Sequence, residues 1–97
     1  MKVELLPEAI DELLAARDHF EGEREGLGTE FLKEMRELQR QIGLRPLRFP
    51  LIQGTQSRRA LGKRFPYLMV FTLVEGRAQI TTVSHQHREP AHWKRPS

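Results

Sequence analysis

The stretch PYLMVFTLVEGRAQITTVSHQ, residues 66–86, decides the fold of this chain. Residues 66–74 are rich in β-branched and aromatic side chains, and residues 77–86 form a second run of β-forming composition, so each predicts a strand. Glu75 and Gly76 form a two-residue connection of the kind that makes a tight hairpin, although Glu is less favourable than Asn or Asp at its first position. Because residues 66–74 are apolar on both faces, we expect them to form the central strand.

An antiparallel hairpin in which Val74 faces Arg77 fixes the other cross-strand pairs. The predicted pairs are Thr72 with Gln79, Val70 with Thr81, Leu68 with Val83, and Pro66 with His85. SRRALGK at 57–63 predicts a third strand, joined to the central strand by a turn near Arg64 and Phe65. This pairing would bring the basic end of the third strand beside His85 and His87.

The N-terminal half predicts a short strand and two helices. VELL, residues 3–6, is expected at a sheet edge, and Pro7 suits the first position of a helix because its missing N–H is not needed there. This helix should run to about Gly22, and a second helix, after a break, should end at Gly43. The apolar positions at helical spacing are Leu6, Ile10, Leu13, Leu14 and Phe20, with Ala9 and Ala16 on the same side, and Phe31, Met35, Leu38 and Ile42.

The expected fold is therefore α+β, with an N-terminal strand and a helical hairpin packed on an antiparallel sheet whose C-terminal part is a three-strand meander. Two helices joined by a short connection share an apolar face that needs a third surface to cover it, and the strands supply that surface. A chain of 97 residues is sized for one domain, 1–97, because a second core could not bury enough apolar surface to be stable.

Charge is distributed unequally along the chain. The whole sequence has 16 Lys+Arg and 13 Asp+Glu, a net charge of +3, but residues 1–44 carry −5 and residues 45–97 carry +8. A field of one sign steers oppositely charged partners, so the basic half is where we expect the functional surface. Arginine predominates there, which favours bidentate contacts with phosphate or carboxylate. The basic residues considered are Arg45, Arg48, Arg58, Arg59, Lys63, Arg64, Arg88, Lys94 and Arg95.

Several classes of protein are excluded by composition. No apolar run approaches the roughly 20 residues of a membrane-spanning helix, so no membrane partner is expected. The start of the chain reaches acidic residues too early for a signal peptide, and the absence of cysteine excludes disulfides and fits a reducing cytoplasm. No Gly-rich phosphate loop and no Ser–His–Asp arrangement occurs, so we expect no cofactor.

The tail VSHQHREPAHWKRPS, residues 83–97, admits three interpretations. His85 and His87 could chelate a metal with His92 or Glu89, but the cationic neighbours would repel it, so we predict no metal site. A second interpretation is acid–base cleavage of RNA. His85 would move protons in that reaction while cations stabilise charge on the phosphate. The third is a surface that binds a polyanion or a protein, where Trp93 would stack on a base or cover the end of the core. His19, in the acidic first helix, is expected to face solvent.

The order of elements, together with these motifs, resembles the RelE/ParE superfamily of toxins from bacterial type II toxin–antitoxin systems. SRRALGKRFPYLMVFTLVEG, residues 57–76, is similar to the Arg-rich strand and the Phe-Pro-Tyr start of the central strand. VSHQHREPAHW, residues 83–93, resembles the His-x-x-Arg-(Asp/Glu)-Pro-x-x-Trp ending of ParE-like members. PEAIDELLAARDHFE and GLGTEFLKEM are similar to the helical hairpin of the family. The resemblance covers nearly the whole chain.

The resemblance implies a plasmid-stabilisation type of protein that arrests growth when free and is held inactive by a cognate antitoxin. The two proteins would form a toxin–antitoxin hetero-oligomer. ParE-like members poison DNA gyrase without a nuclease centre, and RelE-like members cleave messenger RNA on the ribosome. The Phe-Pro-Tyr and Glu-Pro-x-x-Trp elements favour the gyrase-directed activity, and the tail lacks the tyrosine of a RelE-type centre, since Tyr67 is the single tyrosine. The alternatives are a metal-independent endoribonuclease acting on the ribosome and a non-toxic small nucleic-acid-binding protein.

The residues assigned under these hypotheses come from the basic half of the chain. If the protein is a ribonuclease, the catalytic groups would be His85, Arg64, Arg59 and Arg88. The residues expected to bind the target or the antitoxin are Arg58, Arg59, Lys63, Arg64, His87, Arg88, Trp93, Lys94 and Arg95.

Overall fold

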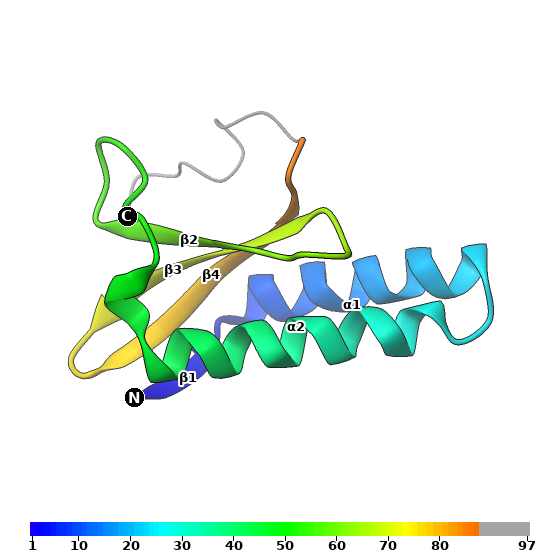
Figure 1. Cartoon of the computed structure of the whole chain (residues 1–97), viewed down its shortest axis with the longest axis horizontal. Helices are drawn as coiled ribbons and strands as arrows, with labels where there is room; N and C mark the ends of the chain where they lie inside the picture. Colours follow the sequence, from blue (N-terminus) through cyan, green and yellow to red (C-terminus); the bar gives the residue numbers. More distant parts are fainter. Residues whose placement is uncertain (88–97) are drawn as a thin grey trace.

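The computed structural model describes residues 1–87 and has two layers, a four-stranded sheet and a helical hairpin across one of its faces (Figure 1). The sheet order is β1-β4-β3-β2, with β1 parallel to β4 and the other neighbours antiparallel. The sheet is thus mixed because the N-terminal strand joins it in parallel. The elements are β1 Lys2–Leu5, α1 Pro7–Glu23, α2 Leu27–Leu44, the 3-10 helix η1 Pro46–Arg48, β2 Ser57–Leu61, β3 Tyr67–Val74 and β4 Arg77–His85.

The helix boundaries lie close to the predicted ones. Helix α1 begins at Pro7, as expected, and α2 is preceded by Gly26, whose φ of 87° is a left-handed conformation that favours glycine. Gly43 does not end α2, which continues to Leu44. A Cβ at Gly43 would lie 3.0 Å from the carbonyl oxygen of Met1. The glycine therefore allows the helix to pack closely against the N-terminus instead of stopping it.

The face that α1 buries is rotated from the one that its apolar pattern predicts. Ala9 and Ala16 are buried, while Ile10 is 42% exposed and Leu14 is 38% exposed, so the prediction that these two residues face the core is wrong. Small side chains let α1 approach the sheet closely, and the buried stripe therefore follows Ala9, Leu13, Ala16 and Phe20. Helix α2 buries Phe31, Met35, Leu38 and Ile42, as predicted.

The β3–β4 hairpin has the predicted turn. Glu75 has a φ of 47° and Gly76 a φ of 78°, as a type I′ turn requires, and this explains why Glu is less favourable than Asn at the first position. Beside the turn, Thr72 pairs with Gln79 as predicted.

Farther along the hairpin, the predicted register is wrong by one residue. A β-bulge lies between Val70 and Phe71, which pair with Thr82 and Ile80, so Thr81 is the extra residue. Leu68 consequently pairs with Ser84 instead of Val83, and Tyr67 instead of Pro66 pairs with His85. The bulge places Val83 and His85 on the face of the sheet that the helices cover.

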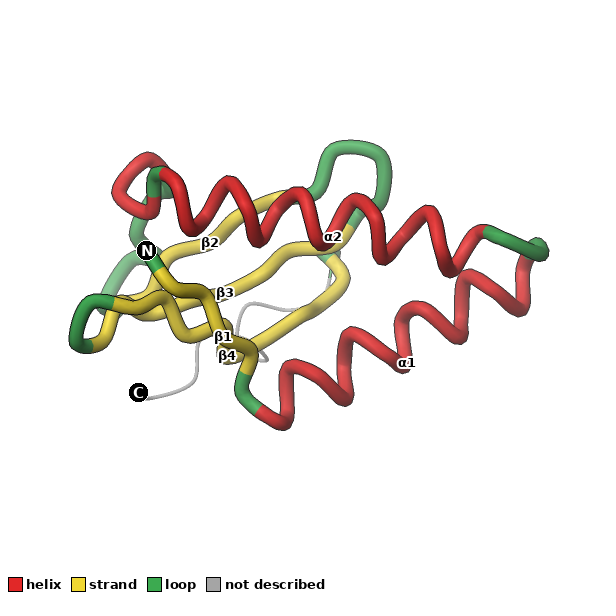
Figure 2. The backbone as a smooth tube through the Cα atoms, turned by 90° about the horizontal axis from the view of Figure 1, so that it is seen from below, coloured by secondary structure: helices red, strands yellow, loops and turns green. Residues whose placement is uncertain are grey.

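Residues 66–74 were expected to form a central strand, and β3 does lie inside the sheet, between β4 and β2. The two helices lie over the sheet and meet at their connecting loop (Figure 2). A smaller apolar cluster of Ile52, Leu68 and Val70 lies on the opposite face of the sheet. Within residues 1–87, no helix is both long enough and apolar enough to cross a membrane.

Candidate functional site

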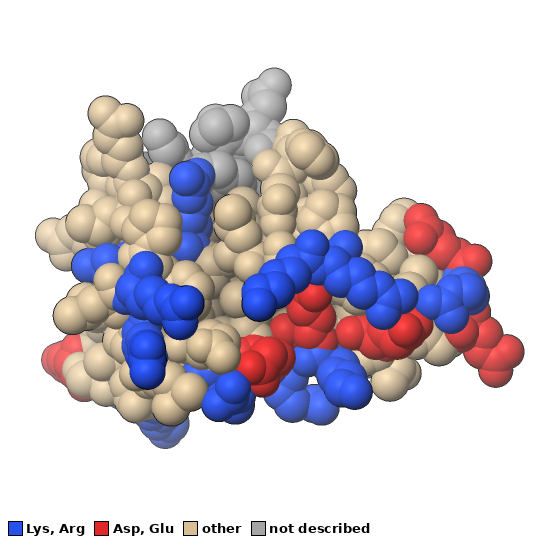
Figure 3. Space-filling model, in the orientation of Figure 1, with Lys and Arg blue, Asp and Glu red and all other residues tan. Residues whose placement is uncertain are grey.

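A groove of about 640 Å³ lies between α2 and the segment that joins β2 to β3. Its apolar lining consists of Leu38, Phe49, Leu61 and Phe65. On the face seen in Figure 3, basic side chains gather where the helical layer meets the sheet, with acidic side chains beside them. The charged lining residues are Glu30, Lys33, Glu34, Glu37, Arg48, Lys63 and Arg64.

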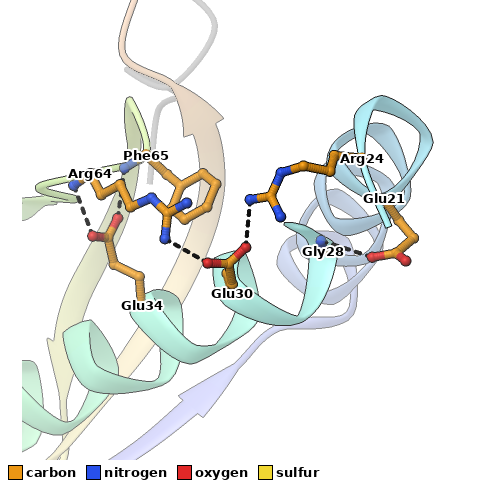
Figure 4. Close-up of polar contacts among 7 residues, drawn as sticks. All are labelled: Glu21, Arg24, Gly28, Glu30, Glu34, Arg64 and Phe65. Atoms are coloured by element: carbon orange, nitrogen blue, oxygen red, sulfur yellow. Dashed lines mark hydrogen bonds and ion pairs between the residues drawn. The ribbon is translucent and has the colours of Figure 1, made fainter. Parts of the chain in front are cut away.

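The carboxylate of Glu34 fixes the β2–β3 connection against α2 (Figure 4). Its Oε1 accepts the backbone N–H of Arg64 at 2.8 Å, and its Oε2 accepts the N–H of Phe65 at 2.9 Å. Gly62 is required here because a Cβ would lie 2.6 Å from the Phe65 carbonyl oxygen and 2.9 Å from Glu34 Oε2. The Phe65 ring is buried against Phe31, with 5.4 Å between ring centroids. The groove therefore has a wall that is held by hydrogen bonds and packing.

The side chain of Arg64 is engaged within the groove. Its Nη1 donates to Glu30 Oε1 at 2.9 Å, and Arg24 donates to Glu30 Oε2 at 2.7 Å (Figure 4). The hydrogen bonds from Arg64 and then Arg24 lower the pKa of Glu30. The Arg64 guanidinium also lies 5.1 Å from the centroid of the Phe65 ring, close enough for a cation–π contact.

A further ion pair lies about two turns beyond Glu30 along α2. Arg40 donates to both carboxylate oxygens of Glu37, at 2.9 Å and 2.7 Å. The hydrogen bonds from Arg40 and then Gln41 lower the pKa of Glu37 to about 2, and the bond to Glu37 raises the pKa of Arg40. All three carboxylates that line the groove thus accept hydrogen bonds from groups of this chain.

A smaller hollow of about 440 Å³ lies on the other side of the hairpin, between α1 and the end of β4. His85 lies there beside Tyr67, with 5.4 Å between ring centroids, and its Nδ1 accepts the backbone N–H of His87 at 3.1 Å. His19 of α1 lines the same hollow and is exposed, as the sequence predicts. Glu12, also from α1, accepts the N–H of Val83 at 3.1 Å just after the bulge.

Among residues 1–87, which the structure describes, the predicted basic residues do not converge on His85. The β2–β3 turn does lie beside the end of β4, because the amide of Gln86 donates to the Gly62 carbonyl at 3.3 Å. The guanidinium of Arg64 nevertheless bonds to α2. Arg58 and Arg59 are successive residues of β2, so their side chains leave opposite faces of the sheet. Arg58 donates to the Phe49 carbonyl at 2.7 Å.

The remaining predicted residues lie beside His85, in the groove, or outside the described part of the chain. His87 is next to His85, and Lys63 lines the groove. Four predicted residues, Arg88, Trp93, Lys94 and Arg95, lie outside residues 1–87, which the structure describes. Within that range, no group of three or more His, Cys, Asp or Glu side chains could hold a metal ion.

Three glutamates that accept backbone N–H groups were not identified from the sequence. Glu12 bonds to Val83, Glu21 bonds to Gly26 and Gly28, and Glu34 bonds to the β2–β3 connection. Acidic residues on a helix surface are common, so their spacing carries no signal of these roles. The glycines around residues 26–28 and at 62 were the available hint, because glycine often marks a close approach of backbone.

The fold resembles a chain of a solved structure described as "Chromosomal ParDE TA system from P. aeruginosa", a toxin–antitoxin system. The alignment covers 88% of this chain and 95% of that chain, with a TM-score of 0.64 and 18% sequence identity. No protein-family model matches the sequence, and a search of curated proteins found no match. At this identity the likeness is one of fold, and it confirms the RelE/ParE-like α+β fold expected from the sequence.

Proposed function

We propose that this protein is the toxin component of a bacterial type II toxin–antitoxin module, acts in the cytoplasm, and is neutralised by a cognate antitoxin. The observation that carries the proposal is the likeness of fold over 88% of this chain and 95% of a chain from a ParDE toxin–antitoxin system. Fold alone does not define function. The basic half of the sequence adds support, because it is suited to bind an acidic partner or a complex that contains nucleic acid.

DNA gyrase is the proposed target, and inhibition without hydrolysis is the proposed mechanism. Phe65, Pro66 and Tyr67 at the start of β3 match the ParE-like pattern described above. Two of the cations that a ribonuclease would use, Arg59 and Arg64, do not line the hollow that contains His85. In-line cleavage of RNA needs a proton-transfer group and positive charge at one phosphate. This separation therefore favours the non-hydrolytic activity.

A second candidate function is a metal-independent endoribonuclease that acts on the ribosome. The observation in its favour is that His19, Tyr67 and His85 line one hollow, since these side chains are common proton donors and acceptors. The hydrogen bond from the N–H of His87 leaves the Nδ1 of His85 unprotonated and its Nε2 as the protonated nitrogen.

Inducible expression in a bacterium that lacks the antitoxin distinguishes the two functions. Growth, chromosome breaks and transcript ends would be followed in one culture for the wild type and for His85→Ala and Tyr67→Phe. Gyrase inhibition predicts growth arrest with gyrase-dependent chromosome breaks and intact transcripts. The two variants should then cause the same chromosome breaks as the wild type. Cut transcripts that disappear in His85→Ala would instead establish the ribonuclease. Normal growth in the presence of folded wild-type protein would refute the proposal that this protein is a toxin.

A further inference from the structure

Helix α1 exposes apolar side chains within an acidic surface. Ile10 is 42% exposed and Leu14, one turn farther along, is 38% exposed. The helix carries six carboxylates and one arginine. Asp11 lies beside Ile10 and Leu14, is exposed, and within residues 1–87 forms no ion pair. We call Ile10, Asp11 and Leu14 the α1 face. Such a surface suits a partner that is both apolar and basic.

The segment that follows α2 has the opposite charge. Its three leucines are more than half exposed, Leu44 at 61%, Leu47 at 72% and Leu51 at 53%. Arg45 and Arg48 lie between them in the sequence and are exposed. Residues 45–74 contain no Asp or Glu that could neutralise these arginines locally. We call these five residues the η1 corner. Its leucines and cations complement the apolar side chains and the carboxylate of the α1 face.

Hydrogen bonds to β2 hold the η1 corner in place. Leu51 forms a β-bridge with Arg58, and the Arg58 guanidinium donates to the Phe49 carbonyl at 2.7 Å. The backbone N–H of Arg59 donates to the Pro50 carbonyl at 3.1 Å. A partner that docks on this segment therefore has little backbone to order, which lowers the entropic cost of binding.

A second copy of this chain supplies the partner for both surfaces. Helix α1 and η1 lie on different sides of the molecule, so the α1 face does not meet the η1 corner of its own chain (Figure 1, Figure 2). A nucleic acid fits the two surfaces poorly, because the carboxylates of α1 repel phosphate and a phosphate backbone would leave the three leucines of the corner uncovered. A contact between copies covers the apolar side chains of both surfaces and brings opposite charges together.

We infer that the α1 face of one copy docks on the η1 corner of the next copy. Ile10 and Leu14 pack against the exposed leucines of the corner, and Asp11 lies beside its arginines. Each contact uses a different surface of each copy and leaves one of each kind free, so association is head-to-tail and continues beyond the dimer. The inference goes beyond the proposed function and does not depend on it.

Two complementary variants of the full chain test the contact without changing net charge. Ile10→Ser/Leu14→Ser disables the α1 face, and Leu47→Ser/Leu51→Ser disables the η1 corner. In sedimentation equilibrium, the average mass of the wild type should rise above 11.3 kDa with concentration, whereas each variant alone should stay at the monomer mass. An equimolar mixture of the two variants should reach twice the monomer mass and no more, because one intact surface of each kind remains. Far-UV circular dichroism would establish that the variants are folded.

Single substitutions provide the controls. Leu61→Ser, at a leucine that is 49% exposed outside both surfaces, should associate as the wild type does. Asp11→Asn should weaken association by about threefold or more at low salt, whereas Glu25→Gln, at an exposed carboxylate outside the α1 face, should change it by less than about twofold. The inference is overturned if the wild type stays monomeric, or if the mixture stays monomeric or grows beyond a dimer. Loss of association in Leu61→Ser, or equal effects of Asp11→Asn and Glu25→Gln, would also overturn it.

Discussion

Replacing Glu34 with alanine should detach the β2–β3 connection from α2. The substitution removes two hydrogen bonds to an ionised acceptor, at 2.8 Å and 2.9 Å. Hydrogen bonds to charged groups each contribute about 1.5–3 kcal/mol, and the bond to Arg64 is exposed, which places it at or below the low end. We therefore expect Glu34→Ala to lower the free energy of unfolding by about 2–3 kcal/mol. In a domain of this size that corresponds to a fall in Tm of about 10–20 °C.

Urea denaturation followed by far-UV circular dichroism measures this change. The matched control is Glu37→Ala, one turn along the same helix, because among residues 1–87 the Glu37 carboxylate bonds only to the side chains of Arg40 and Gln41 and holds no backbone N–H. The control should leave stability unchanged within error, since exposed ion pairs contribute little. Amide hydrogen exchange at Phe65 should also accelerate in Glu34→Ala. Equal stability of the two variants, with unchanged exchange at Phe65, would refute the idea that this carboxylate holds the groove wall.

Three other predictions concern the helices and the hairpin turn. Ala9→Leu should lower the free energy of unfolding by about 1–3 kcal/mol because Ala9 is fully buried, whereas Ile10→Gln should lower it by less than about 1 kcal/mol. Thermal unfolding measures both variants, and a larger loss of stability in Ile10→Gln than in Ala9→Leu would contradict the observed buried face of α1. Glu75→Asn should stabilise the hairpin by about 0.5–1 kcal/mol, because Asn tolerates a φ of 47° better than Glu, and an unchanged or lower Tm would count against the type I′ turn. The hydrogen bonds from Arg40 and Gln41 lower the pKa of Glu37 from 4.5 to about 2, so an NMR titration should give a midpoint near 2, and Arg40→Gln should raise it. Because this ion pair is exposed, the stabilising contribution that is present above pH 4.5 and lost as the pH falls toward 2 should be too small to change the free energy of unfolding measurably.

Local sequence signals predicted most of the elements of this fold. Pro7 marks the start of α1, and the spacing of Phe31 and Ile42 within the apolar stripe identifies the buried face of α2. The Glu75-Gly76 connection gave the correct pairing close to the turn. These features depend on neighbours in the sequence, and periodicity reports such neighbours well.

Features that depend on tertiary contacts were not predictable in the same way. The apolar pattern of α1 includes Ile10 as well as Ala9, and only the close approach of the helix to the sheet decides that Ala9 is buried. Gly43 looks like a helix stop in the sequence, but the residue that requires it is Met1, distant along the chain.

The sequence predicted the types of residue in the candidate site, but it did not predict which way their side chains point. A basic surface in the C-terminal half was expected, and Lys63 and Arg64 do line the groove. The sequence could not indicate that Glu30 would bind the Arg64 guanidinium, because the two residues are 34 positions apart. Arg58 and Arg59 are successive residues of β2, so their side chains lie on opposite faces of the sheet, and basic composition alone does not reveal this.

The extra residue at Thr81 also constrains how this strand can change during evolution. If the strand kept all of its residues but lost the bulge, each side chain before Thr81 would keep its face of the sheet and each side chain after it would change to the opposite face. His85 would then leave the side that faces His19, and Ser84 would take its place. Homologues that lack the bulge should therefore carry their histidine one position nearer to the turn, and an ungapped alignment of the two strands would equate residues from opposite sides of the sheet.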